Sequence, residues 1–238
     1  MTKALKRIAD QYNEMFSGLS ATEILQKIIE THSAKAVFST SLGVEDQVIT
    51  HMLMQISQDA SIFTLDTGRM FPETYEVLEK TEARYGMRIK VYFPDYKAVE
   101  HMVQTRGINL FYYSIENRKF CCQIRKIEPL KRALKGQEVW ITGLRREQSP
   151  TRQDMRYAEW DEGHRIIKVN PLLDWSESQV WDFVRDNNIP YNSLHDKGFP
   201  SIGCQPCTRA VESGEDIRAG RWWWENPDTK ECGLHKGK

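Results

Sequence analysis

The sequence predicts an α/β fold in which helices cover both faces of a single, doubly wound, mostly parallel sheet. Three observations support this prediction. Short apolar runs alternate with amphipathic segments of helical length along most of the chain. Polar or glycine-containing turns follow the apolar runs, and no internal repeat interrupts the pattern. Because helices separate the strands, right-handed crossovers and parallel pairing are expected.

The predicted elements follow one another in a regular order. Two amphipathic helices open the chain, the second with a capping box formed by Ser20 and Glu23. Further helices are predicted over 44–57, 72–85 and 176–188, and the pattern becomes irregular after about residue 190. The predicted strands are KAVFST (35–40), SIFTLD (61–66), IKVYF (89–93), EVWITG (138–143) and RIIKVN (165–170). We expect residues 1–225 to form one domain and residues 226–238 to form a mobile tail.

Charge and hydropathy exclude two classes of partner. The 238 residues include 33 basic and 33 acidic side chains, so the formal net charge is zero. A neutral chain gives no electrostatic reason to expect nucleic-acid or membrane-surface binding. The N-terminus lacks the apolar segment of a signal peptide, and no run approaches the roughly 20 apolar residues of a membrane span. We therefore expect a cytoplasmic protein, and the sequence leaves open whether it forms a homo-oligomer.

Polar residues at the ends of three strands indicate a ligand site. In open parallel sheets, ligands bind beyond the carboxyl ends of the strands. Hydroxyls, a glycine and a helix start follow the first strand, and this combination suits a phosphate or sulfate. Plain helix capping is the alternative, since neither a Walker A loop nor GxGxxG occurs in the sequence. The candidate substrate-binding residues are Ser39, Thr40, Ser41, Gly43, Leu65, Asp66, Thr67, Gly143, Arg145 and Arg152.

The cysteines form two close pairs and one remainder. Cys121 and Cys122 are adjacent, Cys204 and Cys207 form a CxxC pair, and Cys232 stands alone near the end. Four thiolates can hold zinc or an iron–sulfur cluster. Adjacent cysteines chelate one small ion poorly, so a [4Fe–4S] cluster is favoured, with zinc and buried free thiols as alternatives. The remaining cysteine suggests a reactive thiol.

Lys126 follows Cys122 by four residues, one helical turn along the predicted helix. It is either a solvated surface charge or a cation between a negatively charged cluster and an anionic substrate. The second interpretation gives Lys126 a place in the site.

Several motifs together resemble one enzyme family. A serine loop, LDTGRMFPETY, CC with GCQPC, RAGRWWWE and a terminal KECGLH are similar to those of the assimilatory adenylyl-sulfate reductases of bacteria and plants. The resemblance covers essentially the whole chain. It implies an adenine-nucleotide α-hydrolase-like (PP-loop) fold and reduction of adenosine 5′-phosphosulfate (APS) to sulfite and AMP, in cysteine biosynthesis. It also implies thioredoxin or a glutaredoxin-like protein as electron donor, and a [4Fe–4S] cluster on Cys121, Cys122, Cys204 and Cys207.

The same resemblance implies that Cys232 is the nucleophile. Its thiolate would attack the sulfur of APS, and the resulting S-sulfocysteine would release sulfite by thiol exchange. His235 would help to lower the pKa of this thiol. Arg218 and Arg221 would grip the phosphosulfate, because guanidinium groups match such oxyanions. A tail rich in glycine and charge would let Cys232 meet two partners in turn.

Three rival functions remain at this stage. The first is a reductase of the 3′-phosphorylated substrate (PAPS), or of both substrates, because some relatives that carry the cluster accept both. The second is a nucleotide-binding redox sensor in which Cys232 is a reporter thiol. The third is a PP-loop enzyme that hydrolyses ATP, in which the terminal ECGLH has no evident purpose.

Overall fold

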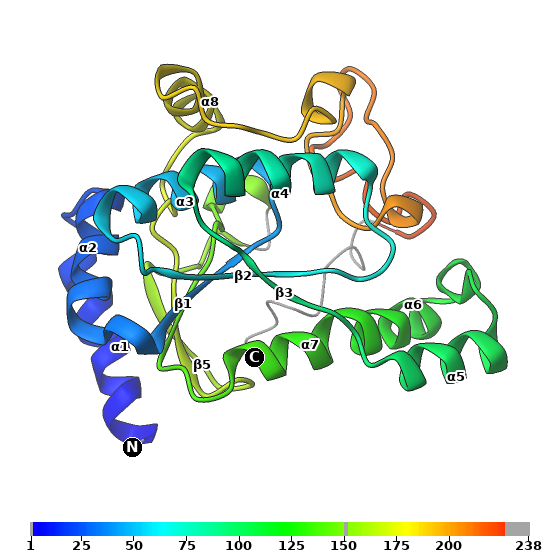
Figure 1. The fold of residues 1–238 in the computed structure, drawn as a ribbon, viewed down its shortest axis with the longest axis horizontal. Helices are drawn as coiled ribbons and strands as arrows, with labels where there is room; N and C mark the ends of the chain where they lie inside the picture. The colour runs from blue at the N-terminus through cyan, green and yellow to red at the C-terminus, as the bar shows by residue number, and fades with distance from the viewer. Residues whose placement is uncertain (1, 150–151, 227–238) are drawn as a thin grey trace.

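One six-stranded sheet forms the centre of the protein, in a computed structural model that describes residues 2–149 and 152–226 (Figure 1). The strand order is β3-β2-β1-β4-β6-β5, and every neighbouring pair is parallel except β5 with β6. The strands are β1 (Ala36–Thr40), β2 (Ser61–Leu65), β3 (Lys90–Tyr92), β4 (Val139–Ile141), β5 (Ala158–Asp161) and β6 (Ile166–Val169). The predicted doubly wound, mostly parallel sheet is confirmed.

Strand β5 is an addition to the five predicted strands. It forms the sheet edge and pairs antiparallel with β6, with Trp160 opposite Ile167. Half of its four residues are acidic, so it lacks the apolar run of a buried strand. Glu159 lies opposite Lys168 on β6, and their side chains form an ion pair of 2.8 Å. Cross-strand charge pairing of this kind stabilises an edge strand that hydrophobicity alone does not reveal.

The two opening helices and the helices predicted over 44–57, 72–85 and 176–188 are all observed. Ser20 and Ser176 each form the expected capping box, with Glu23 and Gln179 respectively. The α-helices are α1 (Thr2–Phe16), α2 (Ala21–His32), α3 (Val44–Ile56), α4 (Pro72–Tyr85), α5 (Tyr96–Arg106), α6 (Ile115–Cys122), α7 (Glu128–Leu134) and α8 (Glu177–Asp186). Short helical turns are η1 (Ser33–Lys35), η2 (Leu110–Tyr112), η3 (Gln123–Ile127), η4 (Arg146–Gln148), η6 (His195–Lys197) and η7 (Gln205–Cys207).

The two faces of the sheet are both covered. Alternate residues of β1 point to opposite faces, so Phe38 joins the larger apolar cluster and Val37 the smaller one. Helices α3, α4 and α8 lie on one side of the sheet in Figure 1, and α7 lies on the other. Leu130 and Leu134 of α7 complete the smaller cluster. A parallel sheet buried on both faces follows from these two layers.

The cysteine region has its own small core. Met102, Leu110 and Phe111 pack with Cys207 and Trp222 from the C-terminal part of the chain. Helix α6 continues into α7 through the π-helical turn η3. This turn changes the predicted relation of Cys122 and Lys126, because a π-helix has more residues per turn than an α-helix.

Within the described residues, no helix is long and apolar enough to cross a membrane.

Candidate functional site

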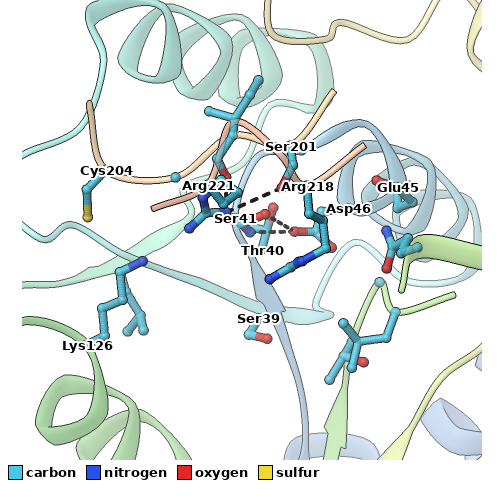
Figure 2. A pocket seen from close by; sticks show the side chains of 18 of the residues that line it. Ser39, Thr40, Ser41, Glu45, Asp46, Lys126, Ser201, Cys204, Arg218 and Arg221 are labelled. Atoms are coloured by element: carbon cyan, nitrogen blue, oxygen red, sulfur yellow. Dashed lines mark hydrogen bonds between the residues drawn. The ribbon is translucent and has the colours of Figure 1, made fainter. Parts of the chain in front are cut away.

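A pocket opens at the point where the order of strands in the sheet reverses, between β1 and β4. The chain winds outward from β1 to β3 and then returns to place β4 on the other side of β1. Ligands of open α/β sheets bind at this switch point. Most of the predicted substrate-binding residues line one pocket here: Ser39, Thr40, Ser41, Gly43, Leu65, Thr67, Gly143 and Arg152. Lys126, Cys204, Arg218 and Arg221 line the same pocket, and Figure 2 shows them around one space.

The serine loop differs from the expected anion cradle. The Ser41 hydroxyl donates to Asp46 Oδ2 at 2.7 Å, and the Ser41 backbone N–H donates to the same oxygen at 2.5 Å (Figure 2). The carboxylate of Asp46 therefore occupies donors that were expected to face a phosphate or sulfate. Burial raises the pKa of Asp46 to about 7, while the bonds from Ser41 oppose this shift. The expectation of a phosphate or sulfate at the serine loop stays a prediction.

Gly143 has a steric reason to be glycine. A Cβ on this residue would overlap Oδ1 of Asp46 and lie 3.3 Å from its Cγ. The close approach of the β4 end to α3 therefore needs a residue without a side chain.

Arg145 and Asp66 are outside the pocket lining. Arg145 is buried and donates to Glu45 Oε1 through Nε and Nη2, at 3.0 and 2.9 Å. Asp66 accepts from the Gly68 N–H at 2.7 Å and from the Tyr75 hydroxyl at 2.9 Å. These contacts stabilise the loops next to the pocket. The sequence had instead predicted that both side chains line the pocket.

Arg221 and Lys126 form what we call the cationic end of the pocket. Arg221 is buried, and its guanidinium lies 4.8 Å from the Trp222 ring centroid. Its Nη1 makes only long hydrogen bonds of 3.4 Å, to the Ser201 hydroxyl and the Ile202 carbonyl. Its Nε is buried and lacks a hydrogen-bond partner within the described residues. Lys126 extends toward the same space from the other side, beside Cys204 (Figure 2).

The four paired cysteines surround a second, smaller cavity. Cys121, Cys122, Cys204 and Cys207 all line it. The loop after β2 anchors one pair, because the Thr67 hydroxyl lies 3.2 Å from Cys204 Sγ and the Gln205 N–H donates to the Arg69 carbonyl. Lys126 lines both this cavity and the larger pocket, so it lies between the cysteines and the cationic end.

The four cysteine thiols suit an iron–sulfur cluster better than a single metal ion. Across residues 2–149 and 152–226, no group of three or more His, Cys, Asp or Glu side chains is arranged to hold a metal ion. Burial raises the pKa of the Cys121 thiol and raises that of Cys207 to about 12, with Lys126 among the opposing charges. Four thiols around one cavity match the all-cysteine ligand set of an iron–sulfur cluster, in which each thiolate binds a different iron.

Two predicted residues, Cys232 and His235, lie outside the described residues. The described chain ends just after a buried ion pair, in which Arg118 Nη2 lies 2.7 Å from Glu225 Oε2. The Arg118 guanidinium also lies 4.6 Å from the Trp222 ring centroid. This pair fixes the chain shortly before residue 227, next to the cysteine cavity that Arg118 also lines.

Sequence reasoning missed part of the pocket lining. Thr142 and Leu144 flank Gly143, so the rule that ligands bind at strand ends could have found them. Ser201, Ile202 and Gly203 directly precede the CxxC pair, which gave an indirect signal. The other missed residues are Glu45, Asp46, Met70, Leu130, Trp140, Gln148, His195, Pro200 and Ile217.

The fold and the pocket together indicate the class of protein. A doubly wound sheet with a polar pocket at its switch point is typical of nucleotide-binding α/β proteins. Among solved structures, FMN adenylyltransferase of Candida glabrata has the same fold, with a TM-score of 0.55 at 13% identity over 99% of this chain and 88% of the other. At that identity the likeness shows the fold alone.

The family follows from closer matches. The family model for the phosphoadenosine phosphosulfate reductase domain matches residues 35–210, and the chain belongs to this family of oxidoreductases. The adenosine 5′-phosphosulfate reductase of Allochromatium vinosum is 52% identical over 91% of this chain and 84% of its own length. That of Neisseria meningitidis serogroup A is 51% identical over 89% and 87%. A phosphoadenylyl-sulfate reductase structure from Candida auris has a TM-score of 0.73 at 30% identity, covering 85% and 96% of the chains.

Proposed function

We propose that this protein reduces APS to sulfite and AMP with a dithiol protein of the thioredoxin or glutaredoxin type, in the cytoplasm. The observation that carries the proposal is the buried guanidinium of Arg221. Within the described residues, its Nε has no hydrogen-bond partner. A buried cation of this kind needs an anion, and the phosphosulfate of APS supplies one. The curated relatives named above bear the name of this activity.

The charges of the pocket support an anionic substrate. Arg218, Arg221 and Lys126 are three cations that line it. Glu45, which lines the same pocket, forms an ion pair of 2.9 Å with Arg145. The relatives from Allochromatium vinosum and Neisseria meningitidis are named as APS reductases, and for this reason APS is preferred over PAPS.

The chemistry assigned to Cys232 balances in two steps. In the first, its thiolate attacks the sulfur of APS, an S–S bond forms, the S–O bond to phosphate breaks, and AMP leaves. In the second, one thiol of the reductant attacks Cys232 Sγ and releases sulfite. The second thiol of the reductant then resolves the mixed disulfide and returns Cys232 as a thiol. The two electrons come from the dithiol, which leaves as a disulfide.

The residues around Cys232 have separate roles in this proposal. His235 lowers the pKa of the Cys232 thiol, since a nearby cation favours the thiolate. Arg218, Arg221 and Lys126 hold the phosphosulfate and disperse the charge that develops on the leaving phosphate. Ser39, Thr40, Leu65, Thr67, Gly143 and Arg152 hold the nucleoside.

A [4Fe–4S] cluster on Cys121, Cys122, Cys204 and Cys207 is part of the proposal. Four separated irons explain how adjacent cysteines serve together with a CxxC pair. When bound, such a cluster supplies a fixed charge beside the substrate pocket. Lys126 then offsets the repulsion between the cluster thiolates and the phosphosulfate, because it lines both cavities.

A steady-state assay tests the proposal. Purified protein with APS and reduced thioredoxin is expected to release sulfite and AMP in equal amounts, and with PAPS to do so more slowly. Cys232→Ser is expected to abolish sulfite release and to retain the visible absorbance of the cluster. Pyrophosphate release from ATP, or nucleotide binding without sulfite release, would favour one of the rival functions.

A further inference from the structure

The three consecutive tryptophans at residues 222–224 differ in burial, and the proposed function gives the most exposed one no role. Trp222 is 1% exposed and packs in the small core around Cys207. Trp223 is 39% exposed, so much of a large apolar ring is in contact with solvent. A single exposed apolar side chain is ordinary, and its neighbours decide whether it belongs to a larger surface.

Several exposed apolar side chains lie on one segment that contacts Trp223. Across residues 2–149 and 152–226, eight large apolar side chains are exposed, and half of them are Trp223 and three residues of the connection between α5 and α6. We call these four the apolar patch: Ile108, Tyr112, Tyr113 and Trp223. The ring centroids of Tyr112 and Trp223 are 6.2 Å apart, which joins the two segments. Aromatic residues are enriched at protein–protein interfaces, so the patch suits a partner that is itself a protein.

The apolar patch is held in place by the residues beneath it. The Tyr112 hydroxyl donates to the Pro206 carbonyl at 2.8 Å, between the two cysteines of the CxxC pair. The Tyr112 ring packs edge-on against Trp224, with 4.5 Å between the ring centroids. Glu225, the next residue, forms the buried ion pair with Arg118. Side chains that are already ordered lose little conformational freedom when a partner binds, so such a surface lowers the cost of docking.

The position of the apolar patch relative to Cys232 identifies the partner. Cys232 follows Glu225 by seven residues, so their Cα atoms are at most about 25 Å apart. In the proposed function a thiol of the reductant must bond to Cys232 Sγ, so that protein must dock within this reach of Glu225. A domain of about 100 residues has a radius of gyration of about 13 Å, so it covers a wide area around its thiol. Trp223, two residues before Glu225, lies in that area.

The size of the apolar patch favours a transient partner over a second copy of this chain. A standard protein interface uses roughly 20–30 residues on each side, and an obligate one uses more. Redox encounters bury smaller areas. Four exposed side chains therefore suit a reductant that binds, exchanges thiols and leaves.

We propose that the apolar patch is the docking surface for the dithiol protein that releases sulfite from Cys232. This inference depends on the proposed function. The docked protein brings one thiol to Cys232 Sγ, sulfite leaves as the new S–S bond forms, and the second thiol resolves the mixed disulfide. The patch takes no part in the first step, in which APS transfers its sulfonate group to Cys232 and AMP leaves.

Single-turnover reduction tests the inference on the complete protein. The protein is first loaded with APS, and the sulfonate on Cys232 is quantified by intact mass. Reduced thioredoxin at limiting concentration, or dithiothreitol, is then added, and the rate of sulfite release is measured. The variants are Trp223→Ser and Tyr113→Ser, and the second preserves the fold because Tyr113 is 73% exposed. Tyr96→Ser is the matched control, since it removes an exposed aromatic ring at the other end of α5.

The expected result is a defect confined to thioredoxin. Both patch variants should load with APS like wild type, because no patch residue lines the substrate pocket. With limiting thioredoxin they should release sulfite about fivefold more slowly or worse, the loss typical of an important interface residue. Dithiothreitol should release sulfite at wild-type rates, because a small dithiol needs no docking surface. Tyr96→Ser should match wild type in all three measurements.

Four outcomes would overturn the inference. Wild-type rates with thioredoxin in both patch variants would mean that the reductant docks elsewhere, and the proposed function would stand. An equal slowing with dithiothreitol would mean that the patch serves this chain's own residues 227–238. A wild-type dimer in sedimentation that both substitutions dissociate would make the patch a contact between copies. If wild type gains no sulfonate from APS, the proposed function is wrong and the inference falls with it.

Discussion

The guanidinium of Arg221 lies directly against the Cα of Gly203. A Cβ on Gly203 would lie 2.6 Å from Cζ of Arg221 and 3.1 Å from its Nε. Gly203 immediately precedes Cys204, so this contact joins the cationic end of the pocket to the CxxC pair. The position of the arginine therefore depends on a residue that has no side chain.

Gly203→Ala is expected to weaken APS binding, because a methyl group forces the guanidinium out of its place. We expect the KM for APS to rise by about tenfold or more, since a charge-assisted hydrogen bond contributes roughly 1.5–3 kcal/mol. Steady-state kinetics with APS measures the effect. Gly18→Ala is the matched control, because its Cβ would meet no atom within 4 Å. An unchanged KM in Gly203→Ala would show that the arginine has no part in substrate binding.

Lys126→Ala is expected to lower kcat/KM for APS by about tenfold to a hundredfold, with little loss of folding stability. The reason is its place between the two cavities, where its charge acts on both the cysteines and the phosphosulfate. Lys126→Arg should recover part of the activity. An exposed cation, altered in Lys197→Ala, serves as control for a general change of charge. Equal kcat/KM in wild type and Lys126→Ala would remove Lys126 from the site.

Asp46 predicts a pH dependence of stability. Its pKa is raised to about 7 by burial, whereas an unfolded aspartate titrates near 4. The folded state therefore binds the proton more tightly, so this group stabilises the fold most below about pH 4. That contribution is lost as pH rises through about 7, and it amounts to a few kcal/mol in order of magnitude.

Asp46→Asn should remove this dependence, because an amide does not titrate. Urea unfolding at pH 5, 6, 7 and 8 should show wild type losing stability relative to the variant as pH rises. Parallel stability profiles for the two proteins would mean that Asp46 is ionised across this range.

The Arg118–Glu225 pair predicts a large loss on removal of one partner. Both side chains are almost fully buried, at 1% and 3% exposure. Glu225→Gln removes the charge of the carboxylate that binds this buried guanidinium, and the expected cost is about 3 kcal/mol or more in the free energy of unfolding. Urea denaturation measures it. Lys197→Gln, which breaks the exposed pair with Glu73, should cost at most about 1 kcal/mol. A cost for Glu225→Gln as small as this control would contradict a structural role for the pair.

The sequence predicted the elements whose stability is local. The capping boxes at Ser20 and Ser176 depend on residues three apart, so their pattern is visible along the chain. The strand ends could be placed together because parallel strands share a carboxyl edge. Edge strand β5 was missed because its stability comes from a cross-strand partner, Lys168 with Glu159, which only the sheet brings together.

The site shows the same division between local and long-range signals. The cysteine pairs and the arginines could be predicted from residue type and spacing alone. The structure places them around adjoining cavities. The capture of the Ser41 donors by Asp46 was not predicted, because serine followed by an acidic helix start suits both an anion site and a self-satisfied loop. The sequence did not indicate that His195 lines the pocket, because a single histidine outside any motif is brought there only by the fold.

The central claim is that Cys232 forms a covalent sulfonate on reaction with APS. The most direct test mixes anaerobic protein with APS or PAPS, without any reductant, and records the intact mass after denaturation. We expect a gain of one SO3 unit that maps to Cys232, forms faster with APS, and is removed by reduced thioredoxin. Protein that binds AMP but gains no mass with either substrate would contradict the proposed mechanism.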